Sequence, residues 1–157
     1  MKEQQNTRAA GIHQTLIILW ASLTISHLLF LLVIYFSKPE LFTLERGPTE
    51  TPLLPVIAIF AVAAIVAVGI SFVIRSRSSK MSEIKQSPVI LQTGLISSLA
   101  LCEAASLFGL VTAFAFSYSY FYFWIFFGVV ASVLHFPKFS EVLAATYKSG
   151  IGNGNGS

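Results

Sequence analysis

Residues 89–116 read VILQTGLISSLALCEAASLFGLVTAFAF, an apolar run with a single carboxylate, Glu103, near its middle. The adjacent Cys102 is the only other ionisable side chain in this run. A helix that spans a membrane needs about 20 apolar residues, so the run predicts such a helix. A charge at bilayer depth costs at least about 2.5–3.5 kcal/mol on insertion scales. A carboxylate is kept there when it is paired, protonated or used, so Glu103 is the first candidate for function.

Three further apolar blocks cover residues 15–36, 53–74 and 120–136, and the last of them is short for a span. The chain of 157 residues is 55% hydrophobic and 11% charged, with a mean hydropathy of +0.75. A soluble domain has about 25% charged residues. The four blocks therefore predict an all-α protein with a single transmembrane domain over 13–137. We expect an integral membrane four-helix bundle made of two antiparallel hairpins.

The two ends of the chain are polar. Residues 1–12 are expected to form a flexible cytoplasmic tail, and residues 138–157 a second one with a Gly- and Asn-rich end. Pro137 blocks simple continuation of the fourth helix. Within the second tail, residues 140–147 are suited to a short helix at the inner membrane surface.

The distribution of Lys and Arg predicts the topology. The two tails and the second connection hold most of these residues: Lys2, Arg8, Arg75, Arg77, Lys80, Lys85, Lys138 and Lys148. The first connection has only Lys38 and Arg46, beside three glutamates, and the third has none. Short loops rich in Lys and Arg stay cytoplasmic, so both termini are expected inside a bacterial inner membrane. This topology explains the pI of about 9.2 without nucleic acid as a partner.

Small residues predict where the helices touch. Helices in lipid associate through close approach and interhelical hydrogen bonds, which favours small side chains. The third block places Gly94, Ser98, Cys102, Ser106 and Gly109 at steps of three and four, and the second block places Ala63 and Ala67 four apart. We expect these positions to pack helix against helix. Glu103 lies about 100° around its helix from the stripe, so it can point toward a neighbouring helix.

His27 is the one histidine deep within an apolar block. At 1.5 Å per residue its depth agrees with that of Glu103 within a few Å. One hypothesis is a contact between His27 and Glu103 at the membrane midplane. The alternative is a neutral imidazole bonded to a backbone carbonyl. With Ser98 and Ser106 as possible hydrogen-bonding neighbours, these residues form the candidate ion-binding set.

The connection before the third block and the block itself read KQSPVILQTGLISSLALCEAASLFGLVTAF over 85–114. This string resembles the carboxylate helix of ATP synthase subunit c, the rotor proteolipid. The matching positions are Leu91, Gln92 and Thr93, then Ala100, Leu101, Glu103 and Ala104, then Phe108, Gly109, Leu110, Val111 and Ala113. The resemblance implies that Glu103 takes the position that binds a proton or Na⁺, and that Lys85 and Gln86 lie near the polar loop.

The chain also differs from that family. Gly69 is the only glycine of the second block, whereas rotor helices repeat glycine. Ser87 separates Gln86 from Pro88, and two further helices flank the hairpin. In four-helix proteolipids the carboxylate is usually on the final helix, whereas here it is on the third.

Two functions follow as expectations. The first is a small membrane subunit of a larger complex that handles protons or ions through Glu103, because the bilayer disfavours the charged form. The second is a purely structural subunit in which a protonated Glu103 is a packing contact. The expected partners are the lipid bilayer and other membrane subunits or further copies of the chain. An enzyme is not expected, since Cys102 and Glu103 do not face each other, and neither a metal nor a cofactor is expected.

Overall fold

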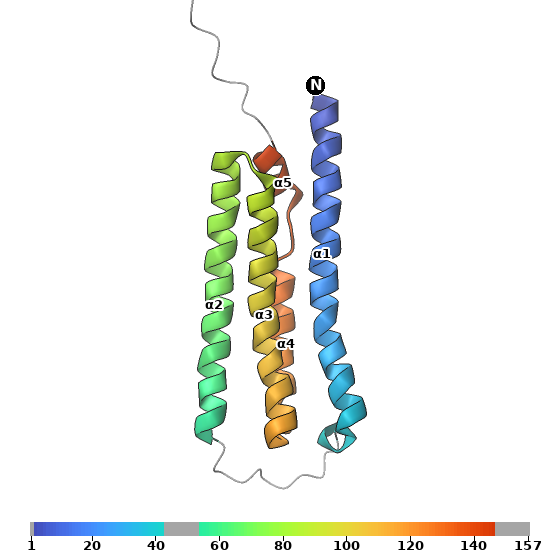
Figure 1. Cartoon of the computed structure of the whole chain (residues 1–157), viewed down its shortest axis with the longest axis vertical. Helices are drawn as coiled ribbons and strands as arrows, with labels where there is room; N and C mark the ends of the chain where they lie inside the picture. Colours follow the sequence, from blue (N-terminus) through green and yellow to red (C-terminus); the bar gives the residue numbers. More distant parts are fainter. Residues whose placement is uncertain (1, 43–53, 147–157) are drawn as a thin grey trace, which may run out of the picture.

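A computed structural model describes residues 2–42 and 54–146. Over these residues the chain is helical, with turns and no strand, which confirms the all-α class. The elements are α1 (Lys2–Ser37), the short 3₁₀ helix η1 (Pro39–Phe42), α2 (Leu54–Lys85), α3 (Pro88–Phe116), α4 (Tyr122–Leu134) and α5 (Phe139–Thr146). Figure 1 shows the long helices side by side, with α1 and α3 running one way and α2 and α4 the other.

Three helices are long and apolar enough to cross a membrane: Asn6–Ser37, Pro55–Lys85 and Pro88–Phe116. The fourth apolar block is broken, because α4 and α5 meet this criterion only as a pair bent by 50°. The described helices are therefore consistent with a multi-pass membrane protein: by length and composition three could span, or four if the bent pair is one span.

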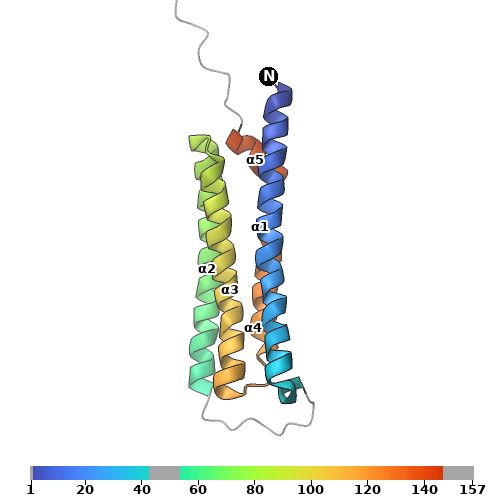
Figure 2. The same cartoon turned by 45° about the vertical axis from the view of Figure 1, so that its right-hand side comes forward.

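Helix α3 is the central element and packs against α1, α2, α4 and α5. Figures 1 and 2 show α1 and α2 on different sides of it. A tight turn joins α2 to α3, with Gln86 in the left-handed region at φ 51° and Pro88 in the first turn of α3. Proline suits that position because its missing N–H would have no partner inside the helix.

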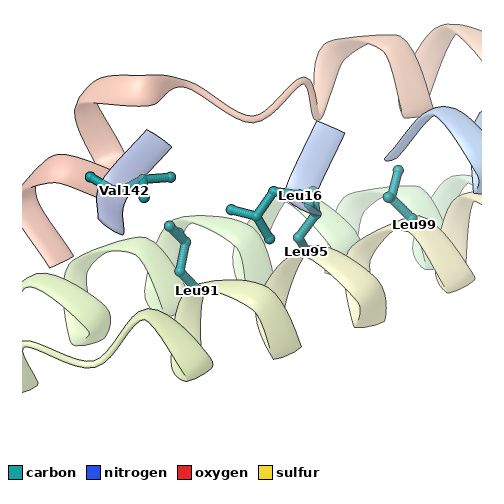
Figure 3. Packing of buried hydrophobic residues seen from close by; sticks show 6 residues of the cluster. Leu16, Leu91, Leu95, Leu99 and Val142 are labelled. Carbon is teal, nitrogen blue, oxygen red and sulfur yellow. The ribbon is translucent and has the colours of Figure 1, made fainter. Parts of the chain in front are cut away.

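The N-terminal segment corrects one expectation. Residues 1–12 were expected to be a flexible tail, but α1 begins at Lys2. Ala9 is fully buried, and Ile12 packs against the same apolar cluster, which joins α1 to α3 and α5. Figure 3 shows this cluster, with Leu16, Leu91, Leu95, Leu99 and Val142 converging between the helices. Tertiary packing therefore extends the helix beyond its apolar block.

Two other boundaries differ for similar reasons. Helix α2 continues past residue 74 to Lys85, and its polar extension buries Ser82. Helix α4 stops at Leu134, two residues before the end of the fourth apolar block. The N-terminal end of α1, the α2–α3 turn and α5 lie at one end of the molecule (Figure 1), which we call the basic end. The described basic residues exposed there are Arg8, Arg77, Lys80, Lys85 and Lys138.

The break between α4 and α5 is a built feature of the fold. The carbonyls freed where α4 ends find side-chain partners: Trp20 Nε1 donates to Ser132 O at 2.8 Å, and His135 Nδ1 lies 2.9 Å from Ala131 O. His13 Nε2 donates to the Pro137 carbonyl at 3.2 Å. The short helix expected over 140–147 is α5, which lies against α1, α2 and α3. The Gly- and Asn-rich end lies outside the described residues.

Candidate functional site

Glu103 is half-buried on α3, near the middle of the helix. Its carboxyl is hydrogen-bonded to the Ser26 hydroxyl of α1, which is also half-buried. The Ser26 hydroxyl is also 2.6 Å from the Leu23 carbonyl, one turn earlier on its own helix. The candidate carboxyl is therefore joined to a neighbouring helix through a serine.

The two contacts of Ser26 depend on the protonation of Glu103. A serine hydroxyl has one hydrogen but can accept two hydrogen bonds. If Glu103 is ionised, Ser26 must turn its hydrogen to the carboxylate and give up the Leu23 carbonyl. If Glu103 is protonated, its own hydroxyl donates to Ser26 while Ser26 donates to Leu23. Both contacts are satisfied together only in the protonated state.

His27 has a different partner from the one that matched depth suggests. It is fully buried, and its Nε2 lies 2.8 Å from the Ser132 hydroxyl of α4. Its ring also interacts with the backbone of Gly128, and Nδ1 is buried and makes no hydrogen bond that meets the usual geometry within the described part of the chain. His27 is within electrostatic range of Glu103, but Ser26 occupies the contact position. The reason is geometric: successive residues are rotated by about 100° on a helix, so Ser26 faces α3 while His27 faces α4.

No family model, curated protein or solved structure matches this chain.

Ser98 and Ser106 serve helix contacts. Ser98 is buried, and its hydroxyl lies 3.0 Å from the Ser71 carbonyl of α2 and 2.7 Å from Gly94 O of its own helix. Ser106 is buried and donates to Ile125 O of α4 at 3.4 Å. Neither hydroxyl is hydrogen-bonded to Glu103 among the described contacts. The structure thus brings Glu103 together with Ser26, and uses the two other serines between α3 and its neighbours.

Cys102 and three polar residues meet in the interior of the helices. The Cys102 thiol lies 3.7 Å from the Ser71 hydroxyl of α2 and also interacts with the Ser132 side chain of α4. Because Ser132 also contacts His27, these side chains connect α1, α2, α3 and α4. All four are buried.

Glycines set the closest helix approaches. A Cβ at Gly94 would collide with the Ser78 side chain of α2, and a Cβ at Gly109 would lie 2.8 Å from the Phe121 carbonyl. Ala63 and Ala67 are only half-buried. The apolar α2 residues buried against Cys102 are instead Ala64 and Val68. The apolar part of the α2 contact is therefore made by the residues that follow Ala63 and Ala67, while Ser71, one turn after Ala67, is buried against Ser98.

Three functional contacts were missed by sequence reasoning. Ser26 is one of two serines, with Ser22, on the same face of α1. Its pairing with Glu103 depends on how α1 is rotated about its axis. Ser132 lies in the fourth apolar block, where a lone serine has no periodic signal. The third is the ion pair Arg75–Glu141, at 2.5 Å, with side chains 11% and 25% exposed.

Metal ligands are not grouped in the described part of the chain. No group of three or more His, Cys, Asp or Glu side chains within residues 2–42 and 54–146 could hold a metal ion. The chemistry available at the site is therefore that of a carboxyl, an imidazole, a thiol and several hydroxyls. Such groups bind and pass protons.

Proposed function

We propose that this protein is a small multi-pass membrane subunit that binds and releases a proton at Glu103. The observation that supports this most directly is the position of Ser26, between the Leu23 carbonyl and Glu103. In the protonated state both contacts are made, and ionisation costs only the Leu23 contact, because Ser26 then turns its one hydrogen to the carboxylate. A carboxyl that served packing alone would need only one of the two states.

The position of Glu103 in a spanning helix makes an ionised carboxyl costly there. A half-buried carboxyl in the middle of a spanning helix has little water around it, and removing a carboxylate from water is costly. His27 is the base nearest in the interior, and its unpartnered Nδ1 lets it accept a hydrogen bond. The resemblance of 85–114 to the rotor proteolipid helix of ATP synthase points to the same residue and the same chemistry.

We further propose a four-helix arrangement with both termini cytoplasmic, in a bacterial inner membrane. The exposed cationic side chains of the basic end support this orientation, because cytoplasmic loops are enriched in Lys and Arg. In this arrangement α4 is a short fourth span, and α5 lies at the inner surface beside the end of α1.

A role as one subunit among several is supported by the exposed apolar faces. On α1 these faces include Ile25, Leu28, Leu29 and Leu32, and on α2 they include Ile59, Val62, Ile65 and Val66. Lipid covers such faces in a membrane, and neighbouring helices can replace it through close packing. The proposed partners are further membrane subunits or further copies of this chain.

A structural role for Glu103 is the second candidate. It is favoured by the same Ser26–Glu103 hydrogen bond, since a permanently protonated carboxyl would simply tie α1 to α3. In that case replacement by glutamine, which keeps a neutral hydrogen-bonding side chain, would leave both assembly and function intact.

Labelling by an apolar carbodiimide separates the two, because the reagent attacks protonated carboxyls. The purified full chain in liposomes is labelled at a series of pH values, and each Glu is assigned by mass spectrometry. If Glu103 exchanges its proton, we expect it to be labelled selectively, and the labelling to fall as the pH rises. The Glu103→Gln variant gives the background, because it lacks the carboxyl. Labelling of Glu103 that does not change with pH would support the structural role, and no labelling in a folded sample would contradict proton exchange.

A further inference from the structure

A row of buried polar side chains begins at the basic end of the molecule. Its first members are Arg75 of α2 and Glu141 of α5, which form the ion pair at 2.5 Å. Next is His135, which lies in the break between α4 and α5 and is 2% exposed. Its ring packs edge-on against Phe72, with 4.4 Å between ring centroids, and it interacts electrostatically with Arg75. The row thus passes from a charged pair to a buried imidazole.

From His135 the row continues toward the middle of α3. His135 approaches the carbonyl of Ser71, whose hydroxyl lies 3.7 Å from the Cys102 thiol. Cys102 interacts with Ser132, and the Ser132 hydroxyl lies 2.8 Å from His27 Nε2. His27 is adjacent in sequence to Ser26, the partner of Glu103. The polar row is therefore His135, Ser71, Cys102, Ser132 and His27. It ends at His27, which interacts electrostatically with Glu103 but is not hydrogen-bonded to it among the described residues.

Unpartnered nitrogen atoms are concentrated along this line. Among the described residues, five buried side-chain N or O atoms have no hydrogen-bond partner. Three of them belong to the polar row or its entrance: Arg75 Nη1, His135 Nε2 and His27 Nδ1. Buried polar atoms in proteins are almost always paired, and ordered water supplies the partner where protein does not. The three atoms therefore mark positions where water completes the row.

The opposite end of the helices is closed by apolar side chains. Ile34, Leu41, Ala113, Phe121 and Ile125 form a buried cluster there. Phe30, Leu31, Leu110 and Val129 pack around it. The buried Thr112 hydroxyl, next to Ala113, donates to Gly109 O of its own helix at 2.9 Å. The cluster itself offers a proton no hydroxyl or imidazole. Any route through the interior is thus open at the basic end and closed at the other.

We propose that the polar row conducts protons between the basic end and Glu103, with water at the unpartnered nitrogens. This inference rests on the proposed function of Glu103. A hydroxyl or an imidazole can accept a hydrogen bond on one side and donate one on the other, which is what a proton relay requires. The Ser71 carbonyl cannot do this, and the Ser71 hydroxyl donates to Val68 O at 2.6 Å. Water on His135 Nε2 therefore carries the proton past Ser71, and water on His27 Nδ1 carries it to Glu103. The row makes Glu103 respond to the pH of one membrane face only.

The titratable groups around Glu103 fit this direction. Helix α1 contributes His27, and α3 itself contributes Cys102. Between residues 54 and 74, α2 has no titratable side chain, and the only one in α4 is Tyr122 at the closed end. The remaining charged groups on the route are Arg75 and Glu141 at its entrance, with His135 just inside. Protons exchanged with Glu103 therefore meet bases on the side of the basic end.

The test uses liposomes in which the pH of the two compartments is set independently. Trypsin cleavage after the exposed Arg77, Lys80 and Lys85 reports which way the basic end faces. The initial rate of carbodiimide labelling at Glu103 is then measured against each pH in turn. We expect the rate to follow the pH at the basic end and to ignore the other. Dependence on the opposite compartment, or equally on both, overturns the route but leaves proton binding intact.

Absence of labelling at every pH would instead overturn the proposed function and the route together. A second measurement uses a rapid pH jump at the basic end of folded variants. His135→Gln and His27→Gln are expected to slow the response of Glu103 by about tenfold or more, because each removes a proton-transfer group. His13→Gln is the matched control, since His13 lies at the same end but binds Pro137 outside the row. Responses as fast as wild type in both test variants would overturn the route.

Discussion

Ser26 of α1 and Glu103 of α3 are hydrogen-bonded between two helices that run in the same direction. Replacing serine by alanine removes the hydroxyl and leaves the carboxyl without this partner. A hydrogen bond to a charged group is worth about 1.5–3 kcal/mol, against about 0.5–1.5 for a neutral one. Ser26→Ala should therefore penalise the ionised form more.

For Ser26→Ala we expect the midpoint of carbodiimide labelling at Glu103 to move to higher pH, by about one pH unit. Ser22→Ala is the control, because Ser22 lies one turn earlier on α1 and is exposed. An unchanged midpoint in Ser26→Ala would show that Ser26 does not act on the carboxyl.

Gly94 sets the distance between α2 and α3. A methyl group there would collide with the Ser78 side chain, and overpacking of this kind costs about 1–3 kcal/mol. We expect Gly94→Ala to lower the thermal unfolding midpoint in detergent, and Ser78→Gly to restore part of it in the double variant.

Gly69→Ala is the control for that substitution. A Cβ at Gly69 meets nothing within 4 Å, and alanine is favoured over glycine in a helix by about 1 kcal/mol. Gly69→Ala should therefore leave the midpoint unchanged or raise it. Equal losses in both variants would contradict the close α2–α3 contact.

Gly128 of α4 is held against both a side chain and the backbone of α3. A Cβ there would collide with the Ser106 hydroxyl and lie 2.8 Å from the Cys102 carbonyl. Because the carbonyl cannot move aside, Gly128→Ala should push α4 away from α3 and separate Ser132 from His27. We expect slower labelling of Glu103 after a pH jump, with only partial recovery in the double variant with Ser106→Ala. Complete recovery would contradict the backbone contact.

The Arg75–Glu141 pair holds α5 against α2. It is only partly exposed, so its loss should cost more than a surface pair, and about 1–3 kcal/mol is expected. Glu141→Gln should loosen α5 and speed trypsin cleavage after Lys138. Glu83→Gln makes the same chemical change at an exposed position of the same end and should leave the cleavage rate unchanged.

Apolar run length predicts the spanning helices well. The third block, expected over 89–116, is α3 at Pro88–Phe116, because a proline at the start and a polar turn at the end bound it. The beginning of α1 could not be predicted this way. Its first turns are polar and become helical where Ala9 and Ile12 pack on other helices. Apolar composition predicts which part of a helix can lie in the membrane, whereas polar extensions of the helix depend on tertiary contacts.

Sequence reasoning singled out Glu103 and His27 but not the residues that they contact, Ser26 and Ser132. Matched depth brought His27 and Glu103 to the same level of the helices, and the structure keeps them in electrostatic range. Which residue of α1 faces α3 depends on rotation about the helix axis, and one residue changes it by about 100°. On α2, Ala64 and Val68, each one residue after an expected position, are the residues buried with Cys102. A single sequence does not determine how far each helix is rotated about its axis, because that depends on the helices packed against it.

Proton exchange by Glu103 in the membrane can be observed at the carboxyl itself by infrared difference spectroscopy. Spectra of the full chain in liposomes are recorded between low and high pH, with Glu103→Gln as the reference. We expect a protonated carboxyl band that is lost reversibly as the pH rises and is absent from the variant. A Glu103 band that persists unchanged over the whole pH range, or is absent throughout, would contradict proton exchange.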